Sequence, residues 1–119
     1  MNERRLSEDN TRPIELTHDE LAMLLASDAR PVLLDCRTHA ERELARIEGS
    51  LHLPISELEG RLGELRVHEE CAIVVYCHHG VRSLAVTVAL RQAGFDDVRS
   101  LAGGIEKWSI HIDATVPRY

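Results

Sequence analysis

The chain has 119 residues, of which 44% are hydrophobic and 29% are charged, and its formal net charge at pH 7 is −6. A chain of this length suits one compact domain, and no apolar run approaches the roughly 20 residues that a membrane-spanning helix needs. The acidic balance, without a dense block of Lys and Arg, argues against nucleic acid and favours small molecules or proteins as partners.

The N-terminal segment predicts little packed structure. Residues 1–12 are polar and aperiodic, so we expect a flexible tail there and a folded domain over residues 13–119. The segment has charges of both signs and no apolar stretch typical of a secretory signal, so we expect a cytoplasmic protein. Three cysteines without CxxC spacing favour reduced thiols over a disulfide framework or a zinc site.

Strand-like and helix-like segments alternate along the rest of the chain. Two of the strand-like segments are continuous apolar runs, which are typical of strands covered by helices on both faces. The expected strands are IEL at 14–16, PVLLD at 31–35, SLHLP at 50–54, AIVVYC at 72–77 and DVRSL at 97–101.

Three of the intervening segments carry the Ser/Thr-x-x-Glu capping box, in which a hydroxyl and a carboxylate satisfy backbone donors at a helix start. These boxes are Thr17 with Glu20, Thr38 with Glu41, and Ser56 with Glu59. The pattern predicts that a helix begins at each of them.

Two further helices are expected near the C-terminus. One spans residues 82–93, with apolar spacing at Leu84 and Val88 and with Gly94 as the residue that follows its end. Gly103 and Gly104 predict a tight turn into the last helix, on which Trp108 would be a core or rim anchor.

Regular alternation of strands and helices predicts an α/β fold with a central, mainly parallel five-stranded sheet flanked by helices. Function in such folds is expected at the carboxyl ends of the strands. Cys77 lies at one of these ends, where a short loop leads directly into a helix. Unpaired N–H groups and the helix dipole stabilise an anion there, so the sequence predicts a reactive thiolate with a lowered pKa.

Four segments, in order along the chain, resemble the rhodanese family of sulfurtransferases. They are LLDCRTHAE (33–41), RIEGSLHLP (46–54), YCHHGVRS (76–83) and LAGGIEKW (101–108). The resemblance implies a rhodanese-like three-layer fold in which Cys77 takes sulfur from a donor as a persulfide and passes it to an acceptor. The C-terminal part is also similar to the rhodanese domain of adenylyltransferase/sulfurtransferase proteins.

The site expected from this resemblance is the loop that follows Cys77. Gly80 allows a positive φ, Arg82 supplies a permanent positive charge, and the two histidines add partial charge when protonated. The residues expected to bind the transferred sulfur are His78, His79, Gly80, Val81 and Arg82. We expect a donor such as thiosulfate, and cyanide, a thiol or a protein as acceptor. We expect no cofactor. We also expect no metal, because the adjacent residues Cys77, His78 and His79 do not readily converge on one ion.

The length of the loop distinguishes sulfur transfer from the phosphatase activity of related proteins. Four residues lie between Cys77 and Arg82, whereas related phosphatases use a Cys-x5-Arg loop to wrap a phosphate, so the shorter loop favours sulfur. The other open alternative is a binding or redox-sensing module without turnover. The loop lacks the lysine of some thiosulfate-using members, so attraction for an inorganic dianion depends on Arg82, the backbone N–H groups and any protonated histidine.

Several other residues receive structural assignments. For Cys36 and Cys71, whose surroundings are not comparable with those of Cys77, we favour structural roles, with a regulatory or resolving thiol that could reach Cys77 as the alternative. For Arg37 we favour an ion pair with Glu41 or Asp35 over a role at the rim of the site. The remaining histidines are scattered singly and receive no role: His18, His39, His52, His68 and His111.

Overall fold

The computed structural model describes residue 10 and residues 12–119, which form a five-stranded parallel sheet with strand order β1-β5-β4-β2-β3. The strands are β1 (Glu15–Leu16), β2 (Val32–Asp35), β3 (Leu51–His52), β4 (Ala72–Tyr76) and β5 (Asp97–Leu101). The helices are α2 (His18–Leu25), α3 (His39–Leu44), α4 (Leu58–Leu65), α5 (Val81–Gln92) and α6 (Gly104–His111), with 3₁₀ turns η1 (Ile55–Glu57) and η2 (Arg66–His68). The predicted α/β sheet is confirmed.

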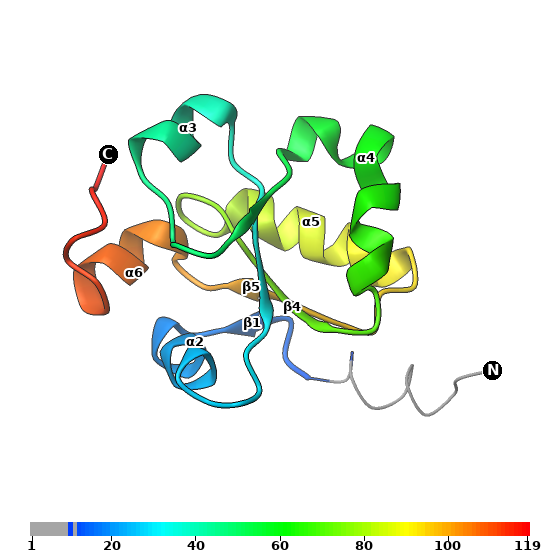
Figure 1. Ribbon diagram of the computed structural model, residues 1–119, viewed down its shortest axis with the longest axis horizontal. Coiled ribbons are helices and arrows are strands. Elements are labelled where there is room, and N and C mark those ends of the chain that lie inside the picture. The colour runs from blue at the N-terminus through cyan, green and yellow to red at the C-terminus, as the bar shows by residue number, and fades with distance from the viewer. Residues whose placement is uncertain (1–9, 11) are drawn as a thin grey trace.

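The side chains of β4 alternate between two apolar layers, as the pleat of a strand requires. Val74 and Tyr76 pack in the layer that contains residues of α2 and α6, whereas Val75 and Cys77 pack with residues of α4 and α5. Figure 1 shows α2 and α4 on opposite sides of the sheet. Trp108 on α6 is 5% exposed in the first layer, so of its two expected roles, core or rim anchor, the structure shows the first.

Two of the three capping boxes are confirmed. Both reciprocal hydrogen bonds form at Thr17 before α2 and at Thr38 before α3. The third prediction is wrong, because Ser56 lies inside the 3₁₀ turn η1, and α4 begins only after Glu57, which makes no side-chain capping bond. The extended backbone of Pro54 begins this turn and delays the α-helix by one short turn.

Helix α5 lies within one residue of its expected bounds, but its buried face differs from the predicted one. Val86 and Leu90 are buried, whereas Val88 is 40% exposed. The helix is apolar on nearly all sides, so periodicity could not identify the face that packs on the sheet. Gly94 follows the C-cap with φ +95°, as expected.

The expected N-terminal tail falls mostly outside the described residues, since 1–9 and 11 are not among them. Contacts with the domain nevertheless begin before residue 13. The Asn10 side-chain amide donates to the Phe95 carbonyl at 2.7 Å, and the Arg12 guanidinium lies 2.6 Å from the Asp97 carboxylate. In the described part of the chain, no helix is both long and apolar enough to cross a membrane.

The start of α6 packs directly against the chain that follows β4. Gly103 and Gly104 both have positive φ, at 79° and 61°, as the tight turn requires. A Cβ atom at Gly104 would lie 2.3 Å from the His78 carbonyl oxygen and 2.5 Å from that of Cys77. Only glycine therefore allows α6 to begin at this point.

We predict that Gly104→Ala lowers the free energy of unfolding by about 2–4 kcal/mol. A left-handed conformation costs a non-glycine residue about 1–2 kcal/mol, and displacing packed backbone costs about 1–3 kcal/mol. Chemical denaturation measures the loss. The matched control is Gly49→Ala, because Gly49 has φ +84° but no atom within 4 Å of the added Cβ. Equal losses in the two variants would contradict the packing argument.

Candidate active site

Cys77 lies at the carboxyl end of β4 and is 1% exposed. Its Sγ accepts hydrogen bonds from the backbone N–H groups of Gly80 at 3.1 Å and Ser83 at 3.3 Å. Gly80 is the N-cap of α5 and has φ +104°, which confirms the expected positive φ and turns its N–H toward the sulfur. The loop therefore closes around Cys77.

The Ser83 hydroxyl is a further contact, to which the sequence analysis gave no role. Its Oγ lies 3.4 Å from the Cys77 Sγ and 2.8 Å from the Oγ of Ser100 on β5. When Cys77 is a thiolate, Ser83 donates to the sulfur and Ser100 can donate to Ser83. The sequence signal for this contact was the position of Ser83, which lies six residues after Cys77 and in the first turn of α5.

Cys36 lies beside Cys77, as the alternative of a thiol that could reach Cys77 requires. It follows β2, the strand next to β4, whose register pairs Asp35 with Tyr76. The Cys36 N–H donates to the Tyr76 carbonyl at 3.1 Å, its thiol donates to the same oxygen at 3.5 Å, and its side chain packs in the same apolar layer as Cys77. Cys71 is exposed, so a packing role does not apply to it.

These contacts determine the charge state of Cys77. The Cys36 thiol lowers the pKa of Cys77 most, and the hydroxyl and N–H of Ser83 and the N–H of Gly80 add to this effect. Together they outweigh burial, and the pKa of Cys77 falls to about 4. The interaction with the Cys77 thiolate beside it, together with burial, raises the pKa of Cys36. At neutral pH the pair is thus a Cys77 thiolate and a Cys36 thiol.

Arg82 carries the positive charge expected of it, but a carboxylate pairs with this charge. Its guanidinium makes two hydrogen bonds to Glu41, at 2.6 and 2.9 Å, and its side chain is 34% exposed. The hydrogen bonds to Glu41 raise the pKa of Arg82, and those from Arg82 lower the pKa of Glu41. For Glu41 the sequence predicted the capping role, which it fulfils, and a possible ion pair with Arg37, but not the pairing with Arg82.

A series of polar contacts connects the Arg82–Glu41 pair with the core. The Tyr119 hydroxyl donates to Glu41 at 2.6 Å and accepts from Arg37 at 2.7 Å. Arg37 is fully buried in an ion pair with Asp35 at 2.9 Å, so the ion pair we favoured forms with Asp35. These polar contacts orient the Glu41 carboxylate, which in turn holds Arg82.

The two loop histidines stack with ring centroids 3.9 Å apart, and the Tyr119 ring stacks on His78 at 4.0 Å. Burial and the neighbouring His79 lower the pKa of His78, which disfavours its charged form. Val81, which begins α5, is 79% exposed at the edge of the loop.

Four of the other histidines form pairs, which differs from the single placement expected. His18 stacks on His111 with centroids 4.5 Å apart, and His39 meets His52 edge to face at 4.8 Å. Over residues 10 and 12–119, no group of three or more His, Cys, Asp or Glu side chains is placed to hold a metal ion.

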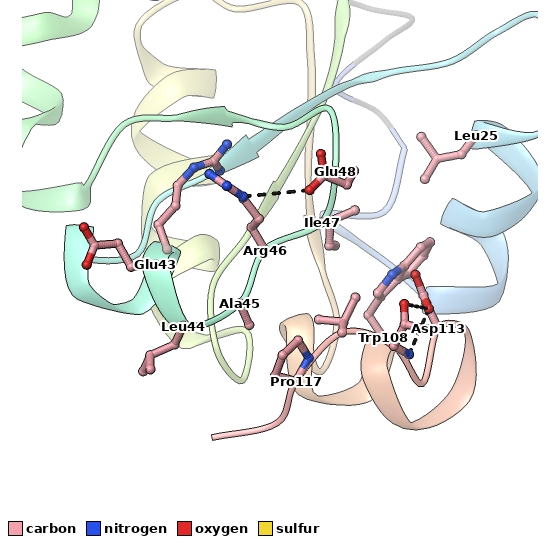
Figure 2. Close-up of a pocket in the computed structure, with 13 residues that line it drawn as sticks. Leu25, Glu43, Leu44, Ala45, Arg46, Ile47, Glu48, Trp108, Asp113 and Pro117 are labelled. Carbon is pink, nitrogen blue, oxygen red and sulfur yellow. Dashed lines mark hydrogen bonds and ion pairs between the residues drawn. The ribbon is translucent and has the colours of Figure 1, made fainter.

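A pocket of about 450 Å³ lies between the segment after α3 and the C-terminal segment, and Figure 2 shows its lining. Trp108 and Pro117 border it, and Arg46 and Glu48 form an ion pair 3.9 Å long at its edge. None of residues 77–82 lines it. The pocket is therefore separate from the Cys77 loop.

Comparison with known proteins agrees with this fold. A family model described as a rhodanese-like domain matches residues 17–111, and the chain belongs to this family. A sulfurtransferase from Allochromatium vinosum is 33% identical over 97 residues, which cover 82% of this chain and 89% of the relative. The thiosulfate sulfurtransferase GlpE from Coxiella burnetii is 36% identical over 80 residues, which cover 67% of this chain and 73% of the relative.

Longer proteins and solved structures show the same relationship. The chain spans about a quarter of the length of several curated relatives. One of them is the adenylyltransferase and sulfurtransferase MOCS3 from Arabidopsis thaliana. The two sequences are 29% identical, and the match covers 92% of this chain and 27% of the relative. The structure of the human single-domain sulfurtransferase TSTD1 is similar, with a TM-score of 0.73, 28% identity, and coverage of 83% of this chain and 97% of that chain.

We predict that Cys77 remains a thiolate at neutral and mildly acidic pH. The ultraviolet absorbance of the thiolate, taken as wild type minus Cys77→Ser, should stay constant at neutral pH and disappear only as the pH falls through about 4. Ser83→Ala should raise this midpoint by about 1–2 pH units, because a hydrogen bond to a charged group contributes about 1.5–3 kcal/mol.

The control for this titration is Ser109→Ala, which removes another buried hydroxyl that bonds to the Val116 carbonyl, away from the loop. A midpoint near the ordinary thiol value of about 8.5 in the wild-type protein would contradict the stabilised anion.

Proposed function

We propose that this chain is a sulfurtransferase that moves a sulfane sulfur from a donor such as thiosulfate to a thiophilic acceptor through a persulfide on Cys77. The observation that carries the proposal is the Cys77 Sγ, which accepts two backbone N–H bonds and contacts the Ser83 hydroxyl at the start of a helix. We propose residues 13–119 as the domain that performs the reaction, and the reducing cytoplasm, which keeps thiols reduced, as its compartment.

In the first step, the Cys77 thiolate attacks the outer sulfur of thiosulfate. A bond forms between the two sulfurs, the bond between the sulfurs of thiosulfate breaks, and sulfite leaves with the electron pair. One thiolate and one dianion give one persulfide anion and one sulfite dianion, so no proton is needed. The lowered pKa of Cys77 supports this step, because the nucleophile is already ionised.

The persulfide that results carries its charge on the outer sulfur. The first N–H groups of a helix have no intrahelical acceptor, so those of Val81 and Arg82 are available to this sulfur. The peptide groups before them also contribute, as the loop N–H groups face inward at Gly80. We assign the binding of the transferred sulfur to this loop, from His78 to Arg82.

In the second step, a nucleophilic acceptor attacks the outer sulfur and regenerates the Cys77 thiolate. Cyanide gives thiocyanate, and a thiolate of a small molecule or of a protein gives a new persulfide, with charge conserved in each case. The sulfurtransferase names of the relatives support a sulfur acceptor over a phosphate ester as the substrate. The four-residue spacing between Cys77 and Arg82 supports the same choice.

We predict that incubation with thiosulfate releases one equivalent of sulfite per chain when no acceptor is present. Intact mass spectrometry, read within the first minutes, should show a gain of about 32 Da on the wild-type protein and none on Cys77→Ser. Addition of cyanide should then give turnover of the wild type alone.

The same assay separates the alternatives. Absence of sulfite and of a mass gain with thiosulfate and other sulfane donors would favour a binding or redox-sensing module. Cys77-dependent hydrolysis of an aryl phosphate would instead favour a phosphatase.

We also predict that Glu41→Gln lowers the KM for thiosulfate about three- to tenfold. Removing the carboxylate frees the charge of Arg82, and a unit charge at about 4 Å in water-like surroundings contributes about 1 kcal/mol. The KM for a neutral dialkyl trisulfide should change little. The matched control is Glu64→Gln, which breaks an exposed ion pair with Arg61 on α4. An unchanged KM for thiosulfate in Glu41→Gln would show that Arg82 serves only to shape the loop.

A further inference from the structure

Cys36 is a buried nucleophile that the proposed sulfur transfer does not use. It is 0% exposed and shares one apolar layer with Cys77. All three cysteines of the chain are free thiols in the structure. A second sulfur placed beside the reactive one has a chemical consequence once Cys77 carries a persulfide.

The backbone places the two residues within reach of a covalent bond. The ladder between β2 and β4 continues one residue past its last pair, because the Cys36 N–H donates to the Tyr76 carbonyl at 3.1 Å. Neighbouring strands lie about 4.8 Å apart, which falls within the Cα separation of about 4.4–6.8 Å that disulfides span. The two side chains point to the same face of the sheet. A disulfide between them would thus need no separation of the strands.

We propose that Cys36 resolves the Cys77 persulfide by attacking its inner sulfur, which forms a Cys36–Cys77 disulfide and releases sulfide. The domain would then have a second activity, the reductive release of sulfide from a sulfane sulfur donor. This inference rests on the proposed function, since the persulfide must form first.

The step balances without an external oxidant. The new bond joins the two cysteine sulfurs, and the bond between the inner and outer sulfurs of the persulfide breaks. The outer sulfur takes that electron pair and the proton of the Cys36 thiol, and it leaves as hydrosulfide. A neutral thiol and a persulfide anion give a neutral disulfide and a hydrosulfide anion. An external dithiol then reduces the disulfide and returns both cysteines to their first state.

The contacts of Cys36 agree with this role. Its thiol donates to the Tyr76 carbonyl at 3.5 Å, and Tyr76 is the residue just before Cys77, so the proton that the leaving sulfur needs lies close to the reacting bond. Cys71 cannot take its place, because Cys71 and Cys77 flank opposite ends of β4. At about 3.3 Å per residue they lie roughly 20 Å apart.

The test compares three forms of the full chain with thiosulfate and no acceptor thiol: Cys71→Ser, Cys71→Ser with Cys36→Ser, and Cys71→Ser with Cys36→Ala. The first variant removes the exposed thiol that could act between molecules. Circular dichroism confirms that each variant is folded. Sulfite, sulfide and intact mass are measured on the same samples over time.

With Cys36 present, we expect one equivalent each of sulfite and sulfide, and a final mass about 2 Da below that of the reduced chain. Without Cys36, we expect one equivalent of sulfite, no sulfide, and a stable gain of about 32 Da. A stable gain of about 32 Da in all three forms, without sulfide, would overturn the resolving role and leave the proposed function intact.

If no form releases sulfite or gains mass, the thiosulfate reaction itself fails. Inorganic polysulfide and the thiol oxidant diamide then test the pair of cysteines directly. Peptide mapping that finds a Cys36–Cys77 disulfide after both treatments, with sulfide released only from polysulfide, supports the resolving role. Mapping that finds no such disulfide overturns it.

Discussion

Two backbone hydrogen bonds at the start of α6 fix the loop on which the site depends. The N–H groups of Ile105 and Glu106 donate to the carbonyls of Cys77 and His78 at 2.9 and 3.1 Å. In a trans peptide the N–H points opposite to the carbonyl, so the N–H groups of His78 and His79 face away from α6. Gly104 makes this approach possible. The glycine turn before α6 is thus part of the anion site.

The negative charge at Cys77 is stabilised mainly by oriented dipoles. The charge of Arg82 is paired with that of Glu41, and the lowered pKa of His78 disfavours its charged form. The Cys36 and Ser83 side chains and the backbone N–H groups stabilise the anion in a site that is almost fully buried. Such dipoles are already oriented before the reaction, and they stabilise a diffuse sulfur anion without transferring a proton to it. This matches a group that alternates between thiolate and persulfide.

The sequence was informative about local features and about the loop. Continuous apolar runs located the strands, and capping boxes located the starts of α2 and α3, because each signal lies within a few adjacent residues. It could not reveal contacts between distant segments. The pairing of Glu41 with Arg82, and the placement of Cys36 beside Cys77, both depend on the register of the folded sheet. Strand order was the missing information, since parallel neighbours bring their carboxyl ends together.

The central claim is that the loop after β4 holds a persulfide on Cys77 through its N–H groups. A crystal structure of the Cys36→Ser protein after exposure to thiosulfate tests it most directly. The account predicts one extra sulfur atom bonded to the Cys77 Sγ and within hydrogen-bond distance of the N–H groups at the start of α5. An intact thiosulfate ion beside an unmodified Cys77, or an extra sulfur that points away from these N–H groups, would contradict it.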